Sequence, residues 1–120
     1  MFPVDNFKSF YNDKLENKKS GTVVALYVHE QFNAVENDSA SMTKAHIESL
    51  FLHVTQDNFK ANVGVVYRPP NSSINDFKDD IQNLIKTLPK TNVTYILGDF
   101  NLHKSAMNPI VDTFEQFFYI

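Results

Sequence analysis

Stretches rich in Val, Ile, Leu and aromatic residues predict the strands of this chain. Four such stretches lack internal proline and span approximately residues 23 to 29, 47 to 55, 61 to 67 and 93 to 97. The first strand of the chain is therefore expected at Thr22 to Val28. Residues 30 to 46 are polar and lack a clear hydrophobic period, so we expect a loop there, with room for one short turn.

The segment between the third and fourth stretches has the pattern of an amphipathic helix. Its apolar residues follow mainly at steps of three and four and are Ile74, Phe77, Ile81, Leu84, Ile85 and Leu88. Ser73 is a suitable N-cap, with Asp76 three residues later, and Pro89 ends the pattern. This connection is long enough for a parallel crossover, which would bring the ends of the two flanking strands to one edge of a sheet. The pattern predicts an α/β fold.

A second helix is expected close to the end of the chain. Asn108 would be its cap and Pro109 its first residue. Its apolar residues, interpreted as core packing, are Ile110, Val111, Phe114, Phe117 and Phe118.

The fourth predicted strand runs into the sequence Gly98-Asp99-Phe100-Asn101. Alternate residues of an extended segment point to the same face, so Asp99 and Asn101 are expected to emerge together, with Phe100 turned back into the core. A carboxylate that orients a water or a metal, beside an amide that donates to a phosphate oxygen, suits phosphoester hydrolysis. The alternative is an ordinary Gly-Asp turn capped by Asn.

The third predicted strand stops at a Tyr67-Arg68-Pro69-Pro70 corner, because proline cannot continue a central strand. Arg68 is the only arginine among the eleven Lys and Arg residues. A planar donor fork at a strand end suits a phosphate or a fixed carboxylate, which makes Arg68 a candidate phosphate-binding residue. The alternative is a surface arginine in a turn.

These segments, in this order and joined by one helix, resemble the endonuclease/exonuclease/phosphatase family. The similarity is closest to the endonuclease domain of non-LTR (LINE-like) retrotransposons, and it extends over nearly all 120 residues as one partial domain. Ser20 and Thr22 stand where glycines are usual in that family. The matching runs are Ser20 to Val28, Ile47 to Phe51, Tyr67 to Asn71 and Gly98 to Asn101.

The resemblance implies roles for individual residues. Asp99 would orient or deprotonate the attacking water, and Asn101 would help to hold the scissile phosphate. The Tyr67 hydroxyl would lie against the phosphate and stabilise its developing charge. Asn71 would contact the phosphate, although the doubled proline shifts its spacing by one residue. For Arg68 the resemblance supplies a motif position without a settled role.

The resemblance also implies what surrounds these residues. The family fold is a four-layer α/β/β/α sandwich, of which the chain is expected to be the central portion, truncated at both ends. The glutamate that binds the catalytic Mg²⁺ and the C-terminal Asp-His pair have no match here. Mg²⁺, a DNA substrate, a nuclear location and a reverse transcriptase in the full element are implied by the family alone.

Composition limits the partners of the chain. Its formal net charge of −3 gives no overall attraction to DNA. The basic stretch of Lys8, Lys14, Lys18 and Lys19 is interpreted as a solvated surface rather than as a DNA-binding one. The absence of cysteine excludes disulfides and thiolate metal sites. No apolar run is long enough for a membrane span, and the N-terminal residues lack the pattern of a secretory signal.

Three hypotheses on function remain open at this point. The first is a Mg²⁺-dependent phosphodiesterase that nicks DNA through Asp99, Asn101 and Tyr67. The second is a non-catalytic remnant of a mobile element, which we favour for this chain because half of the catalytic set is unmatched. The third is a small α/β binding module in which both motifs are only turns.

Two further expectations concern ligands and assembly. Glu36, Asp38 and Glu48 are candidate metal ligands without convergent spacing, and such carboxylates are more often solvated. The stretches Val63 to Tyr67 and Val93 to Leu97 are apolar on both faces and so require cover on both. A truncated sheet would leave a face and an edge uncovered, which predicts marginal stability or self-association.

Overall fold

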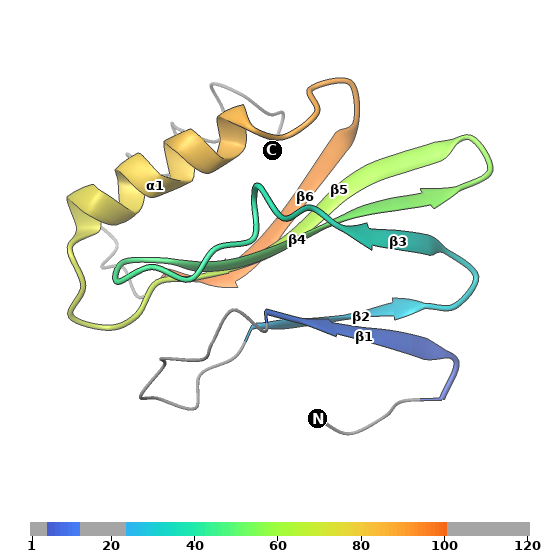
Figure 1. Ribbon diagram of the computed structural model, residues 1–120, viewed down its shortest axis with the longest axis horizontal. Coiled ribbons are helices and arrows are strands. Elements are labelled where there is room, and N and C mark those ends of the chain that lie inside the picture. Colours follow the sequence, from blue (N-terminus) through green and yellow to red (C-terminus); the bar gives the residue numbers. More distant parts are fainter. Residues whose placement is uncertain (1–4, 13–23, 101–120) are drawn as a thin grey trace.

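Residues 5–12 and 24–100 are described by this computed structural model, and they form six strands and one helix (Figure 1). The predicted α/β class is therefore confirmed. The strands are β1 (Phe7–Tyr11), β2 (Ala25–His29), β3 (Asn33–Glu36), β4 (Glu48–Gln56), β5 (Phe59–Tyr67) and β6 (Val93–Asp99), and the helix is α1 (Ile74–Lys86).

The strands form two separate sheets. β1 and β2 make an antiparallel pair, while the larger sheet has the order β3-β4-β5-β6. Within the larger sheet β3, β4 and β5 are antiparallel neighbours, and β6 lies parallel to β5. Because α1 connects β5 to β6, the predicted parallel crossover is confirmed (Figure 1).

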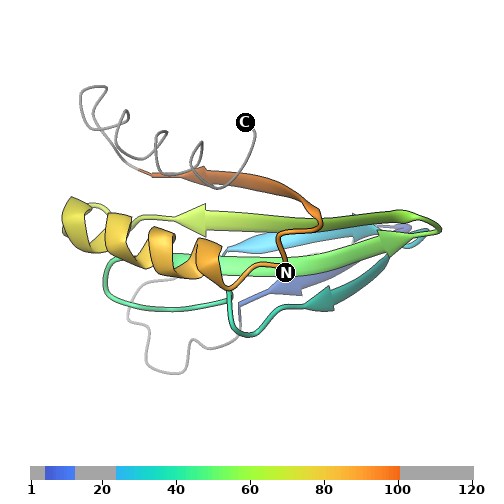
Figure 2. The same cartoon turned by 90° about the horizontal axis from the view of Figure 1, so that it is seen from above.

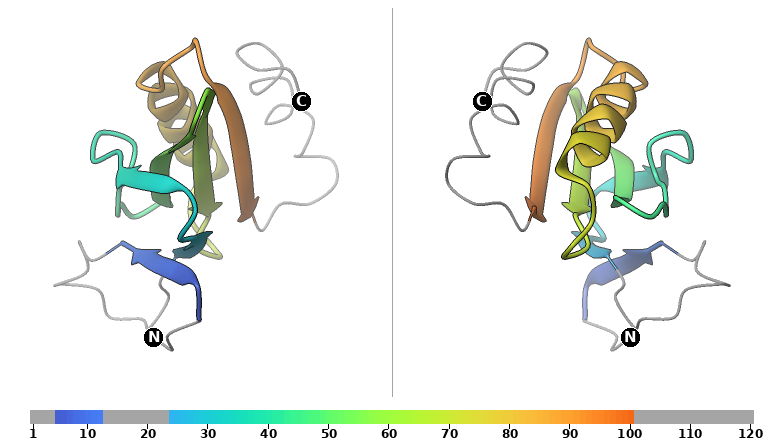
Figure 3. Two further views of the ribbon diagram at one scale, coloured as in Figure 1. Left: turned by 90° about the vertical axis from the view of Figure 1, so that its right-hand side faces the viewer. Right: turned by 90° about the vertical axis from the view of Figure 1, so that its left-hand side faces the viewer.

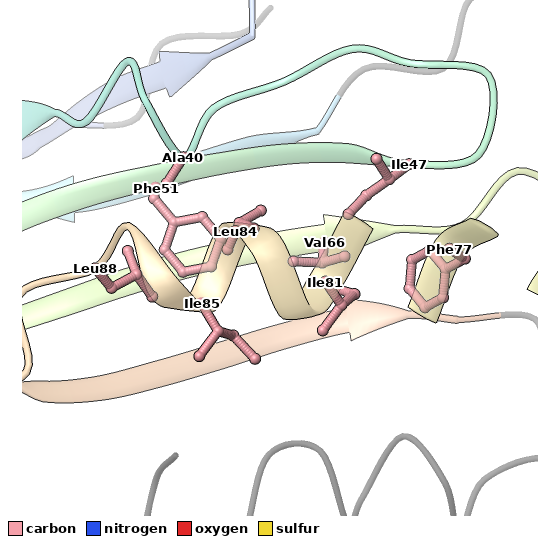
Figure 4. Close-up of a cluster of buried hydrophobic side chains, with 9 residues drawn as sticks. All are labelled: Ala40, Ile47, Phe51, Val66, Phe77, Ile81, Leu84, Ile85 and Leu88. Atoms are coloured by element: carbon pink, nitrogen blue, oxygen red, sulfur yellow. The ribbon is translucent and has the colours of Figure 1, made fainter. Parts of the chain in front are cut away.

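Different elements pack against the two faces of the larger sheet. The helix side holds one buried apolar cluster, made of Ala40, Ile47, Phe51, Val66, Phe77, Ile81, Leu84, Ile85 and Leu88 (Figure 4). On the opposite face, Leu50, Leu52 and Val54 of β4 pack with Phe10 of β1 and Leu26 of β2. The described residues thus form three layers, with α1 on one side of the larger sheet and β1–β2 on the other (Figures 2 and 3).

The helix forms as its sequence predicts. The Ser73 hydroxyl accepts a hydrogen bond from the Asp76 N–H at 3.1 Å, so Ser73 is the N-cap. The apolar stripe faces the sheet, with Phe77, Ile81, Leu84 and Ile85 buried. Thr87 closes the last turn, two residues before Pro89. The helix therefore returns the chain to the start of β6, which allows β6 to run parallel to β5 and to end beside it.

Two strands were not expected from the sequence. Residues 7–11 form β1, so the prediction that the first strand starts at Thr22 was wrong. Residues 33–36 form β3 within the segment predicted to be a loop. Both strands are short and partly polar, and each exists because it pairs with a longer or more apolar neighbour, β2 or β4. Propensity along the chain does not reveal such pairing.

Asn12 connects the small sheet to the large one. It follows β1 and is fully buried, and its Nδ2 donates to the carbonyls of Met42 and Ser49 at 3.0 Å each. Its backbone N–H donates to the carbonyl of Val24 at 3.3 Å. Because Ser49 is the second residue of β4, the side-chain amide of Asn12 holds the end of β1 against the start of β4 in the larger sheet.

Some predictions fall on parts of the chain that the structure does not describe. The helix expected from Asn108, Asn101 itself, and Lys14, Lys18 and Lys19 all lie outside the described residues. Within residues 5–12 and 24–100, no helix is both long and apolar enough to cross a membrane.

Candidate functional site

The ends of β5 and β6 meet at one edge of the larger sheet. Tyr67, the last residue of β5, is the register partner of Asp99, the last residue of the parallel strand β6. On the other side of Tyr67, its antiparallel partner is Glu48, the first residue of β4. Register partners point to the same face of a sheet, so Glu48, Tyr67 and Asp99 form a row across three strands. The prediction that the two motifs share an edge is confirmed.

The three members of this row differ in exposure. Glu48 is buried, Tyr67 is half-buried and Asp99 is exposed. The exposure of the side chains therefore increases along the row, from Glu48 on β4 to Asp99 on β6. Tyr67 packs against the apolar cluster under β1–β2, which includes Leu50, Leu52 and Val54 of β4. Asp99 is accessible to a ligand, with the Tyr67 side chain beside it on the same face.

Phe100 turns back into the core after the exposed Asp99. Its ring packs against the helix-side cluster and lies 5.6 Å from the ring of Phe77, measured between centroids. The expected inward orientation of Phe100 is confirmed. It anchors the chain directly after Asp99, so the strand end is held by packing as well as by the sheet.

Gly98 allows β6 to approach β5 at this point. A Cβ atom on Gly98 would overlap the backbone carbonyl of Val66, its register partner on β5. A backbone carbonyl cannot move aside without breaking the ladder, so only glycine fits here. The glycine of the Gly-Asp-Phe-Asn motif is thus explained by strand packing beside Asp99.

Arg68 lies at the centre of the corner and is 5% exposed. Its backbone N–H donates to the carbonyl of Asp99 at 3.0 Å, and its Nε donates to the carbonyl of Phe100 at 2.9 Å. Its Nη1 lies 3.2 Å from the carbonyl of Pro69, and 3.0 Å and 3.2 Å from the carbonyl and hydroxyl oxygens of Ser72. The alternative of an exposed turn arginine is excluded by this burial.

The turn after Arg68 carries Asn71. The Ser72 hydroxyl donates to the carbonyl of Pro69 at 2.7 Å, which closes the turn. Asn71 is exposed and has a φ of 65°, a left-handed conformation that asparagine tolerates better than most residues. Ser72 was not singled out in the sequence, and only its position after a Pro-Pro-Asn turn hinted at this role.

The described residues contain no cluster of three or more potential metal ligands. Among residues 5–12 and 24–100, no group of three or more Asp, Glu, His or Cys side chains is placed to hold a metal ion. Glu36, Asp38 and Glu48 therefore do not converge with Asp99 on a common centre. The glutamate that the resemblance implies as the Mg²⁺ ligand has no match in the sequence, and no other carboxylate cluster replaces it among the described residues.

Comparison of the chain with protein-family models, with curated proteins and with solved structures found no match. The family resemblance consequently depends on the motifs themselves. What the structure adds is their geometry, which brings Tyr67, Arg68, Asn71 and Asp99 to one corner of the larger sheet.

Proposed function

We propose that this corner is the phosphate-binding part of an endonuclease site of the endonuclease/exonuclease/phosphatase type, as in non-LTR retrotransposons. The observation that carries the proposal is the register of Tyr67 with Asp99 at the ends of two parallel strands. It puts a phenol beside an exposed carboxylate at the sheet edge where α/β proteins commonly bind ligands.

The residues of the corner would act on a phosphodiester as follows. The Tyr67 hydroxyl donates to a non-bridging oxygen, whose negative charge increases during attack. The Asp99 carboxylate accepts a hydrogen bond from the attacking water and so directs it at phosphorus. The side-chain amide of Asn71 donates a hydrogen bond to the phosphate, and by the resemblance that of Asn101 does so as well.

We further propose that the chain does not cleave DNA by itself. The family's Mg²⁺ ligand and its Asp-His pair have no match in the sequence, and the described residues form no metal-binding group. Members of a catalytic unit act together, so loss of one removes most of the rate. In this proposal the activity belongs to a complete element, which has the four-layer sandwich and a reverse transcriptase. Such an element would use Mg²⁺ and act on DNA in the nucleus.

A phosphate titration followed by NMR tests the binding part. Inorganic phosphate, added to the isotopically labelled chain at constant ionic strength, should shift the amide signals of Tyr67, Asn71 and Asp99. Chloride at the same ionic strength is the control and should leave them in place. If phosphate moves none of the three signals, the corner is only a pair of turns and the chain is a binding module of another kind.

A plasmid assay tests the catalytic part. Supercoiled plasmid incubated with the chain and Mg²⁺ should be nicked no faster than with Asp99→Ala. Nicking that disappears in Asp99→Ala would show an active enzyme and refute the proposed inactivity. The two assays are independent, because phosphate binding does not require turnover.

We also propose that copies of the chain associate through β6. This strand is the last one of the larger sheet within the described residues, and its Val93, Tyr95 and Leu97 side chains are 54%, 51% and 60% exposed on one face. Beside them on β5 lie the partly buried Val63 and Val65. Exposed apolar rows on an open strand favour association with another surface of the same kind.

A further inference from the structure

We propose that Arg68 is a positioning residue that holds both loops of the corner in their relative orientation, an inference that depends on the proposed function only for its phosphate readout. Its Nε donates to the carbonyl of Phe100, and its Nη1 donates to Pro69 and Ser72, so these bonds reach two loops that are far apart in sequence. One side chain thereby connects the turn that carries Asn71 to the strand end that carries Asp99.

The contacts on the β6 side control the backbone around Asp99. The N–H of Arg68 holds the carbonyl of Asp99, and its Nε holds the carbonyl of Phe100. Two successive peptide planes after the Asp99 side chain are thus fixed by one residue. Strand ends fray because their ladder stops, and this pair of bonds continues the restraint past the last residue of β6.

The contacts on the other side control the turn. Nη1 approaches the carbonyls of Pro69 and Ser72, which flank the exposed pair Pro70-Asn71. The turn has to hold Asn71 at a positive φ, a conformation that a free loop occupies only part of the time. A donor that binds both ends of the turn favours that conformation.

The geometry of these contacts requires arginine. Nε and Nη1 lie in one rigid plane and point to carbonyls on different loops, whereas lysine offers one point charge at the end of a flexible stem. The charge of Arg68 is also buried among carbonyl oxygens. Its main effect on a phosphate would then be indirect, through the loops, rather than by direct contact from solvent.

The experiment compares Arg68→Lys and Arg68→Gln with Lys60→Gln in the full chain. Lys60 is exposed near the opposite end of β5, the strand that Arg68 follows, so Lys60→Gln removes one positive charge without touching the corner. Hydrogen exchange of the Arg68 amide reports the bond to the Asp99 carbonyl, and the phosphate titration reports the site. Exchange of α1 amides reports whether each variant keeps its fold.

In both Arg68 variants we expect the amide at position 68 to exchange about tenfold faster or more, because the bonds of the guanidinium to both loops are lost. Phosphate shifts at Asn71 and Asp99 should weaken together, while Lys60→Gln stays like the wild type. The positioning role requires Arg68→Lys to behave like Arg68→Gln. If Arg68→Lys binds phosphate as the wild type does, the charge matters and the positioning role is refuted.

Two other outcomes are equally decisive. Weaker phosphate binding with unchanged exchange at position 68 would make Arg68 a direct phosphate ligand and overturn the inference. If the wild type does not respond to phosphate, the proposed function fails, but the exchange comparison still decides whether Arg68 holds the loops. Should the Arg68 variants not fold, Ser72→Ala removes one acceptor of Nη1, and faster exchange at position 68 in that variant is then the required result.

Discussion

Tyr67 and Asp99 are register partners at the ends of two parallel strands, although a helix separates them in the sequence. Their side chains leave the same face of the sheet, one half-buried and one exposed. A ligand at this edge meets the phenol and the carboxylate together. Mutation of these two residues is therefore the most direct way to separate effects on phosphate binding from effects on folding.

Tyr67→Phe removes the hydroxyl and keeps the ring that packs on the cluster under β1–β2. We expect the free energy of unfolding to change by about 1 kcal/mol or less. Phosphate binding should weaken about tenfold to a hundredfold, since a hydrogen bond to a charged group contributes about 1.5–3 kcal/mol. The matched control is Tyr95→Phe on the neighbouring strand, whose tyrosine is exposed. Equal phosphate binding in the two variants would remove Tyr67 from the site.

Gly98→Ala and Gly64→Ala should both destabilise the chain, but for different reasons. The new Cβ at position 64 would overlap the Phe51 ring, whereas at position 98 it would overlap the Val66 carbonyl. Overpacking of this kind costs about 1–3 kcal/mol. Urea unfolding gives the stability of each variant.

The two glycine variants separate in a double-mutant cycle with Phe51→Leu. The smaller side chain leaves room for the Cβ at position 64, so Gly64→Ala should cost less in that background. Gly98→Ala should cost the same in both backgrounds, because a backbone carbonyl blocks it. Equal coupling of Phe51→Leu to both glycines would contradict this account of Gly98.

Asn71→Gly and Asn71→Ala distinguish the backbone role of Asn71 from that of its side chain. Glycine adopts the left-handed φ of 65° freely, while alanine is disfavoured there by about 1–2 kcal/mol. We expect Asn71→Gly to fold as well as the wild type and Asn71→Ala to be less stable in thermal unfolding. Phosphate shifts should decrease in both if the amide binds phosphate. Undiminished shifts in Asn71→Gly would leave Asn71 with a turn role only.

Leu97→Lys tests association through β6. Leu97 is the most exposed of the three apolar residues on that face, so the substitution should cost little stability in the single chain. Sedimentation velocity of the wild type should show species larger than a monomer, with a smaller fraction in Leu97→Lys. Val35→Lys, at an exposed position of β3, makes the same kind of change away from β6 and is the control, which should associate as the wild type does. A wild type that is monomeric and unfolds in one sharp transition would refute the association.

The sequence by itself determined the elements whose causes are local. The stripe from Phe77 to Leu88, the Ser73 cap and the apolar runs of β4, β5 and β6 follow from periodicity and from short-range hydrogen bonds. The crossover between β5 and β6 also followed, because a connection of that length permits parallel pairing. Asp99 was singled out by its position at the end of a predicted strand, and Tyr67 by the family resemblance.

Only the tertiary structure decided the features that depend on distant partners. β1 and β3 are strands because β2 and β4 pair with them, and Asn12 is buried because Met42 and Ser49 offer carbonyls to its amide. The donor fork of Arg68 made it a candidate phosphate ligand in the sequence, whereas the carbonyls that surround it are known only from the structure. Backbone acceptors occur at every residue, and which of them a side chain reaches is set by how the folded chain brings its loops together.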